Sequence, residues 1–270
     1  MRIAYQPCAA LAPCVKELWY CDGHQGIHGT QRVLPKGRFE LAFSLAEGPI
    51  SALTDPMGDG FEIAPSLLMG IRSHFSLIDS AKLQSAMGVV FRTGGVHAFL
   101  NMPADAFHDR NVSLDLIWGS MAQTLRDQLR SANDPAKKFD ILEAALLSRI
   151  NVRVQLNTAV RYALLEFARR PQIPMVRELA REAGLSRRRF AQLFREQIGL
   201  TPKLYCRLHR FQNVLKQISS GASVDWVQLA LAAGYCDQAH LAHEFRNFSG
   251  LSPSAYLASA RRFPSHASSD

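Results

Sequence analysis

No apolar run in this sequence of 270 residues approaches the length of about 18 residues that a helix needs to cross a membrane. Proline and polar residues interrupt the start, Met1–Pro7, too early for a secretory signal peptide. The five cysteines are an odd number and are scattered at positions 8, 14, 21, 206 and 236. These absences predict a reduced, cytoplasmic protein that has no structural disulfides and no membrane partner.

Common catalytic motifs are also missing. The sequence contains no Gly-x-Ser-x-Gly, no P-loop and no dinucleotide fingerprint. A lone Gly94-Gly95 pair before a helical turn could present amides to an anion, but a tight turn from strand to helix explains it more simply. We therefore expect no catalytic residues and no cofactor, and the chain is predicted not to be an enzyme.

One group of metal-type side chains lies close together in sequence: Cys14, Cys21, His24 and His28. They are separated by 6, 2 and 3 residues, and this spacing matches no common zinc pattern. Metal-binding cupin enzymes would need a His-x-His pair, which the sequence lacks. Ordinary thiols and loop histidines are the simpler interpretation, so we expect no metal site.

The net charge of +8 is confined to one part of the chain. Residues 1–160 hold 15 Lys and Arg against 15 Asp and Glu, whereas residues 161–270 hold 16 against 8. A basic balance limited to one domain is the electrostatic signature of nucleic-acid binding. The length of the chain favours two domains, each large enough for its own core.

A short sequence pattern occurs twice between Val176 and Tyr256. The first half of each copy matches at an offset of 50, and the second half at an offset of 51, so the second copy has gained one residue just after its glycine. The matching pairs are Leu179/Leu229, Ala180/Ala230, Ala183/Ala233, Gly184/Gly234, Phe194/Phe245, Arg195/Arg246, Gly199/Gly250, Pro202/Pro253 and Tyr205/Tyr256.

Each copy is typical of two helices joined by a glycine turn. Gly184 and Gly234 stand where a first helix would end in a left-handed residue, and Ser186 can cap the helix that follows. That helix carries the apolar stripe Phe190, Leu193, Phe194 and Ile198, with Arg and Gln on the opposite face. Such a helix suits a DNA major groove. An ordinary amphipathic helix pair is the alternative, and two copies in register disfavour it.

These motifs resemble the double helix-turn-helix DNA-binding domain of the AraC/XylS family of bacterial transcription regulators. The resemblance rests on Leu-Ala-x-x-Ala-Gly-x-Ser at 179–186, Phe194-Arg195, Gly199–Pro202, Arg210-Phe211, Ala-Ala-Gly-Tyr-x-Asp-Gln at 232–238, Phe245-Arg246 and Gly250–Pro253 with Tyr256. It covers about a third of the chain. In this family the long helix between the units, with its stripe Leu204, Leu208, Phe211, Leu215 and Ile218, spaces two recognition helices that enter successive major grooves.

The resemblance also implies roles for individual residues. The base-facing residues would be Arg188, Ala191 and Gln192 in the first unit and Gln238, Ala239 and His243 in the second. The candidates for phosphate contact are Arg187, Arg195, Lys203 and Arg246, with packing or solvation as the alternative for Arg195 and Arg246. The second recognition helix, from Asp237 to Glu244, has two acids and no Lys or Arg, which predicts a weaker contribution to affinity.

The N-terminal part is typical of a β barrel or sandwich of the cupin-like kind. Its expected strands are Glu17–Cys21, Gln31–Leu34, Phe39–Leu45, Ile50–Leu53, Leu67–Gly70, Phe75–Asp79 and Gly88–Arg92. The segments Val33–Phe43 and Val89–Val96 resemble an N-terminal domain of uncharacterised function found in some members of the family. The predicted fold class is therefore α+β, with a β-rich N-terminal domain and an all-α C-terminal domain.

We expect the domains to divide as follows: 1–150 for the β-rich sensing or dimerisation domain with its closing helices, 151–170 for a connecting helix, 171–262 for the double helix-turn-helix and 263–270 for a disordered tail. Short helical turns are predicted at Val96–Asn101 and Ala104–Asp109 and two longer helices over 114–129 and 139–150. In the family, helices at this position often support dimerisation. Closing the core of the first domain is the alternative.

Six aromatic residues of the N-terminal part form a candidate effector pocket, with simple core packing as the alternative: Trp19, Tyr20, Phe39, Phe43, Phe75 and Phe91. The sequence thus predicts a transcription regulator that binds a double-stranded DNA operator, with a small-molecule effector, a homodimer partner and, for an activator, RNA polymerase as candidate partners. Two other interpretations stay open. One is an enzyme whose N-terminal domain is targeted to DNA, and the other is an architectural DNA-binding protein without a ligand.

Overall fold

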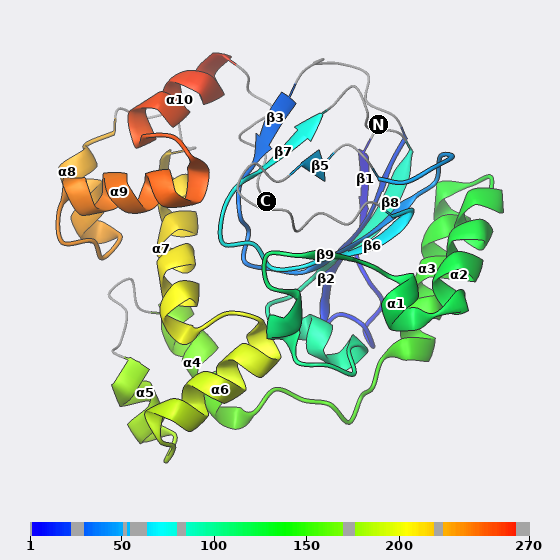
Figure 1. Cartoon of the computed structure of the whole chain (residues 1–270), viewed down its shortest axis with the longest axis horizontal. Coiled ribbons are helices and arrows are strands. Elements are labelled where there is room, and N and C mark those ends of the chain that lie inside the picture. Colours follow the sequence, from blue (N-terminus) through cyan, green and yellow to red (C-terminus); the bar gives the residue numbers. More distant parts are fainter. Residues whose placement is uncertain are drawn as a thin grey trace.

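The computed structural model describes residues 2–22, 30–50, 53–54, 64–79, 85–169, 176–218 and 224–262. The segment predicted to be a disordered tail lies outside these residues, as do His24 and His28, the two histidines considered above as metal ligands. Within them, the predicted class is confirmed: an antiparallel β domain is followed by helices (Figure 1).

Two antiparallel sheets face each other in the N-terminal domain (Figure 1). The larger has the order β1-β2-β8-β4-β6-β9, and the smaller has the order β3-β7-β5. The strands are β1 (Arg2–Tyr5), β2 (Val15–Cys21), β3 (Thr30–Val33), β4 (Glu40–Ser44), β5 (Leu53–Thr54), β6 (Ser66–Met69), β7 (Ser76–Asp79), β8 (Ala86–Phe91) and β9 (Asn111–Ser113).

The seven predicted strands overlap β2 to β8, whereas β1 and β9 were not predicted. β8 lies between β2 and β4 and is buried from Met87 to Phe91, which explains its continuous apolar run. Two short 3₁₀ helices follow, η2 (Gly95–Phe99) and η3 (Ala104–Phe107), close to the two predicted turns.

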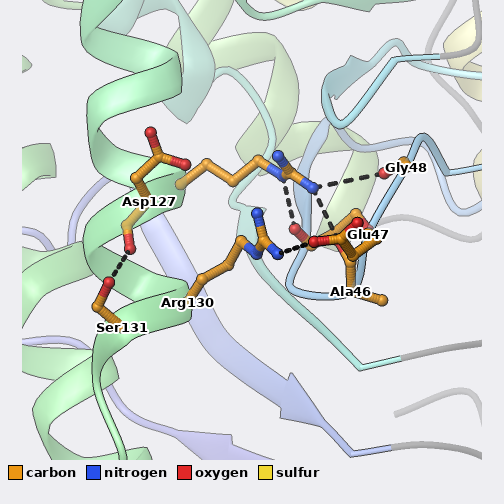
Figure 2. A network of polar contacts seen from close by, with 8 residues as sticks. Ala46, Glu47, Gly48, Asp127, Arg130 and Ser131 are labelled. Carbon is orange, nitrogen blue, oxygen red and sulfur yellow. Dashed lines mark hydrogen bonds and ion pairs between the residues drawn. The ribbon is translucent and has the colours of Figure 1, made fainter.

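A pair of helices covers one side of the larger sheet. After the short α1 (Asp115–Trp118), α2 (Ser120–Ser131) and α3 (Pro135–Arg149) pack together, and Asp134 caps α3 by accepting from the Ala136 amide. Arg126 of α2 donates to the carbonyl oxygens of Ser44 and Ala46 at 2.7 and 2.8 Å, and Arg130 pairs with Glu47 at 3.1 Å (Figure 2). These contacts tie α2 to the segment that follows β4.

The remaining helices divide between a separate hydrophobic core and the core cluster that also contains the β domain. They are α4 (Thr158–Arg169), α5 (Val176–Glu182), α6 (Arg187–Ile198), α7 (Pro202–Ile218), α8 (Trp226–Ala232), α9 (Gln238–Ser249) and α10 (Pro253–Arg262). Phe167 of α4 packs edge-on to Phe194 of α6 with ring centroids 6.1 Å apart. The helix α4 begins at Thr158, seven residues after the start of the connecting helix predicted over 151–170. Its buried residues belong to the core around α5 and α6.

The β domain touches the helical part at several points. A Cβ added to Gly37 would lie 3.2 Å from Leu208 of α7, and the Gln212 amide of α7 donates to the Pro35 carbonyl oxygen. Arg32 of β3 donates to the Ser249 carbonyl oxygen at the end of α9, at 2.9 Å. η3 packs against α6. The two domains thus meet on both recognition-type helices and on α7.

Candidate nucleic-acid interface

The first repeat folds as α5, a glycine turn and α6. Gly184 has a φ of 67°, a left-handed conformation that glycine adopts without steric cost. The hydroxyl of Ser186 accepts a hydrogen bond from the Arg189 amide at 3.2 Å, which caps α6 as predicted. The predicted apolar stripe is buried, and Phe190 and Phe194 are 0% exposed. Because this face is buried, the opposite face of α6 is turned to solvent.

Three of the residues predicted to meet DNA in the first unit are exposed: Arg187, Arg188 and Gln192. Ala191 is half-buried. The amide of Gln192 donates to Glu196 one turn later at 2.7 Å, a contact that orients the Gln192 side chain along the helix surface. An exposed Arg and Gln one turn apart match the donor and acceptor edges of guanine and adenine in a major groove.

The second repeat folds in the same way from α8 and α9. Gly234 has a φ of 80°, and Asp237 caps α9 by accepting from the His240 amide at 2.7 Å. The residues predicted to face bases, Gln238, Ala239 and His243, are all exposed. Asp237 therefore caps the start of α9 in the second unit, as Ser186 caps the start of α6 in the first.

The two acids of the second recognition helix do not both lie on its solvent face. Asp237 holds the free amides at the start of α9. Glu244 is 6% exposed, and its carboxylate accepts from the Arg207 guanidinium at 2.6 and 2.8 Å. Burial alone would raise the pKa of Glu244, but the hydrogen bonds and charge of Arg207 outweigh it and lower that pKa. The exposed face of α9 is thus less acidic than the sequence suggested.

α7 holds the two units at its opposite ends (Figure 1). Four residues of its predicted apolar stripe are buried, and Leu204 is half-buried. At the second unit Arg210 donates to the Gly234 carbonyl oxygen at 2.8 Å, and its guanidinium lies 4.9 Å from the centre of the Tyr235 ring. These contacts fasten the turn between α8 and α9 to α7, so the helix sets the spacing of the recognition helices.

The residues predicted to contact phosphates differ in their surroundings. Arg187, Lys203 and Arg246 are exposed, and nothing among the described residues pairs with their charged groups. Arg195 is also exposed, but its Nε lies 3.9 Å from the Asp105 carboxylate of η3. Its guanidinium thus faces the N-terminal domain in this structure.

The six aromatic residues of the candidate effector pocket do not gather in one place. Trp19 lines a cavity of about 240 Å³ between the two sheets. Tyr20, Phe39, Phe43 and Phe91 are buried in the core and are absent from the described lining of that cavity. Phe75 lies under the Arg32 guanidinium, 3.9 Å from its ring centre. The polar residues that do line the cavity, among them Arg38, Arg72 and Asn111, were not predicted.

The described part of the chain contains no cluster of three or more His, Cys, Asp or Glu placed to hold a metal ion. Across the same residues, every helix falls short of the length and apolar character that a bilayer crossing requires.

The sequence matches two family models. The model described as a helix-turn-helix domain covers residues 179–259, which include both copies of the repeat. The model described as a domain of unknown function (DUF6597) covers residues 3–113. A curated protein of Haemophilus influenzae, described as an uncharacterized HTH-type transcriptional regulator, is 33% identical over 124 residues. That match spans 44% of this chain and only 39% of the relative.

Solved structures with low sequence identity also align with the chain. Apo ToxT from Vibrio cholerae aligns with a TM-score of 0.47 and 12% identity, over 89% of this chain and 97% of that one. The DNA-binding domain of AdpA, a global transcriptional factor solved in complex with a target DNA, aligns with a TM-score of 0.36 and 24% identity. The AdpA alignment spans 40% of this chain and 98% of that one.

Proposed function

We propose that this chain, whose residues 179–259 match a helix-turn-helix domain model, is a sequence-specific regulator of transcription of the AraC type. It binds a double-stranded DNA operator through α6 and α9, and its N-terminal domain modulates that binding. The proposal places the protein in the cytoplasm, with RNA polymerase as the partner of an activator and a second copy of the chain as a candidate dimer partner.

One observation carries the proposal. Two helices of the same repeat, each capped at its start, expose polar faces at opposite ends of one long helix. The excess positive charge of the chain lies in this same part. A scaffold of this kind can place two polar helix faces in successive major grooves, and its charge attracts the phosphate backbone.

A selection experiment tests the proposal. The full-length protein is incubated with a pool of random duplexes, bound duplexes are amplified over several rounds, and the recovered sequences are aligned. We expect two conserved half-sites whose centres are about 10 base pairs apart, one helical turn of DNA. The proposal also requires that affinity for the selected duplex falls steeply with salt. Recovery of unrelated sequences bound no better than the starting pool would contradict it and would favour an architectural role.

The N-terminal cavity supports the modulating role. Its walls are mostly apolar, and two buried donors in them have no hydrogen-bond partner among the described residues, Arg38 Nε and Asn111 Nδ2. Asn111 is 4% exposed, and its Oδ1 already accepts from Arg72 at 2.8 Å, which leaves its NH₂ group for another acceptor. Buried donors without partners are rare in folded proteins. We therefore propose that a small molecule with an apolar body and hydrogen-bond acceptors occupies this cavity.

The cavity wall is continuous with the contacts to the helical part. The segment from Leu34 to Arg38 lines the cavity and also meets α7 through Gly37 and Pro35. On the other side, Arg72 lines the cavity and donates to the Asp109 carbonyl oxygen at 2.9 Å, in the segment that follows η3. A ligand in the cavity would therefore touch the segment that meets α7, and through Arg72 it would be linked to the residues just after η3, which packs against α6.

A cavity-filling variant tests the effector proposal. Ala42 of β4 lines the cavity and is 4% exposed, so Ala42→Leu would reduce the free volume. A library of small carboxylates and amides is screened for compounds that raise the melting temperature of the wild-type protein. We expect that compounds found in this way lose their effect on Ala42→Leu and keep it on Ala136→Leu, an exposed position on α3. Compounds that act equally on both variants would place the ligand elsewhere.

A further inference from the structure

A second, more polar hollow lies where the β domain meets α7. It has a volume of about 250 Å³ and is bounded by the turn 36–38 on one side and by α7 on the other. Contacts at Gly37 and Gln212 hold the two walls together. We call this hollow the interdomain cleft.

The interdomain cleft is lined by charges of one sign. Lys16, Lys36 and Arg38 come from the β domain, and Lys216 comes from α7. No Asp or Glu stands among the described residues that line it. Burial and the nearby charge of Lys216 lower the pKa of His209, which also lines the cleft. Like charges held together from two domains repel each other unless a counter-charge lies between them.

Several of these cations are free to bind a ligand. Within the described residues, Lys36, Arg38 and Lys216 make no hydrogen bond or ion pair. The neutral polar groups of the cleft are partly engaged, since Gln212 donates to Pro35 and Asn213 contacts His209 at 3.3 Å. The side chains of the cleft that remain available to a ligand are therefore cationic, and they come from both the β domain and α7.

We propose that the interdomain cleft binds a small polyanion, a molecule with two or more phosphate or carboxylate groups. Lys36 and Arg38 hold it from the β domain, and Lys216 holds it from α7. The apolar cavity between the sheets shares Lys36 and Arg38 with the interdomain cleft, but its remaining walls are mostly hydrophobic and include Glu40, so its ligand needs an apolar body.

The position of the cleft favours a small molecule over DNA. Leu208 and Gln212 place this side of α7 against the β domain. The residues predicted to read bases lie on the solvent faces of other helices, α6 and α9. A polyanion in the cleft would bridge the two domains and so hold α7 in its present position relative to the β domain.

Calorimetric titration of the full-length protein tests the site, with pyrophosphate and citrate as separate probes. Ionic strength is held constant, so that general screening does not change during the titration. We expect at least one probe to bind at one site per chain. Lys36→Gln and Lys216→Gln should each weaken that binding about tenfold or more, because each removes a charge-assisted hydrogen bond. The probe that binds more tightly decides between phosphate and carboxylate ligands.

Lys137→Gln is the matched control, because Lys137 is an exposed lysine on α3 outside the cleft. It should change the affinity by less than about twofold. The two substituted lysines, Lys36 and Lys216, are exposed, so unchanged melting temperatures will confirm that the variants are folded. The proposal is overturned if neither probe gives a saturable binding curve, or if Lys137→Gln weakens binding as much as the cleft variants do. It is also overturned if only one of Lys36→Gln and Lys216→Gln weakens binding.

A competition experiment tests whether the interdomain cleft binds DNA rather than a small anion. A random-sequence duplex is added to the protein loaded with pyrophosphate or citrate. If the duplex displaces the probe and itself loses affinity on Lys36→Gln, the cleft belongs to DNA and the proposal is wrong. If the protein fails to bind any duplex while the probe still binds, the proposed function is refuted and the anion site stands.

Discussion

Arg207 of α7 and Glu244 of α9 form a two-pronged ion pair, with Nε–Oε2 and Nη2–Oε1 distances of 2.6 and 2.8 Å. The carboxylate is almost fully buried, and the guanidinium also lies over the Phe248 ring, 5.6 Å from its centre. A paired Arg and carboxylate restrict both distance and orientation. The pair therefore fixes the second recognition helix to the helix that spaces the two units.

This ion pair predicts an acid-dependent loss of stability. Because the folded-state pKa of Glu244 is lowered from 4.5, its contribution is present above the unfolded value and is lost as pH falls through the folded value. Glu244→Gln should lower the free energy of unfolding by about 2 kcal/mol at neutral pH, a value discounted because Arg207 is partly exposed. The deficit should shrink as pH falls below 4.5. Urea denaturation of the wild-type protein and of Glu244→Gln between pH 7 and about pH 3 measures this difference in unfolding free energy. A difference that is constant over this range would contradict a stabilising ion pair between Arg207 and Glu244.

The repeat could be predicted from sequence because its signals are local. A glycine in a left-handed turn, a capping Ser186 and a period of apolar residues act within a few residues of each other, and each is present in the structure. The strands β2 to β8 were predictable for the same reason, since apolar runs and turns mark them.

The features that sequence could not give depend on contacts between distant residues. Glu244 looked like an acid on a DNA-facing surface, but a partner 37 residues away buries it. Trp19 and Phe43 have similar apolar character, yet only the first lines the cavity, because successive residues of a strand point to opposite faces and the curvature of the sheets decides which face is hollow. β9 is only three residues long and pairs with β6, far away in sequence.

Asp109 predicts a stability effect in the β domain. It is the single non-glycine residue with a positive φ among the described residues, at 55°, and its carboxylate accepts from the Ser73 amide and hydroxyl at 2.7 and 2.5 Å. Asp109→Ala loses these hydrogen bonds and keeps the unfavourable backbone angle, so it should cost about 2–3 kcal/mol of unfolding free energy. Asp109→Gly relieves the angle and should cost less. Equal losses in a urea titration of the two variants would show that the backbone angle is unimportant.

The contact between Arg195 and Asp105 predicts competition between DNA and the β domain. If Arg195 contacts a phosphate, as the resemblance implies, its attraction to Asp105 at 3.9 Å opposes that contact. Asp105→Asn should then raise affinity for operator and random duplexes alike, by about twofold to fivefold, because an exposed ion pair contributes up to about 1 kcal/mol. Arg195→Ala should lower both affinities and reduce the salt slope by about one. Unchanged binding in both variants would leave Arg195 a purely structural role.

The two recognition helices should differ in how much specificity they supply. Arg188 is exposed one turn before Gln192 on the face of α6 opposite the buried Phe190, and an Arg placed there can make two hydrogen bonds to guanine, worth about 1–3 kcal/mol of discrimination. In the second unit Gln238 and His243 are exposed without a permanent positive charge. Arg188→Ala should therefore weaken binding to the selected operator far more than binding to a scrambled duplex.

Gln238→Ala should weaken operator binding less than Arg188→Ala, and its effect should be confined to the other half-site, since α7 keeps the two units apart. The measurement is a titration of both variants against the operator, the scrambled duplex and two operators in which one half-site is scrambled. Arg177→Ala is the control, an exposed arginine at the start of α5 that lies outside both predicted recognition faces. If Arg188→Ala lowers operator and scrambled affinities equally, Arg188 holds the phosphate backbone. In that case base reading in the first unit would have to come from Gln192, whose amide already contacts Glu196 and would need to exchange that contact for a base.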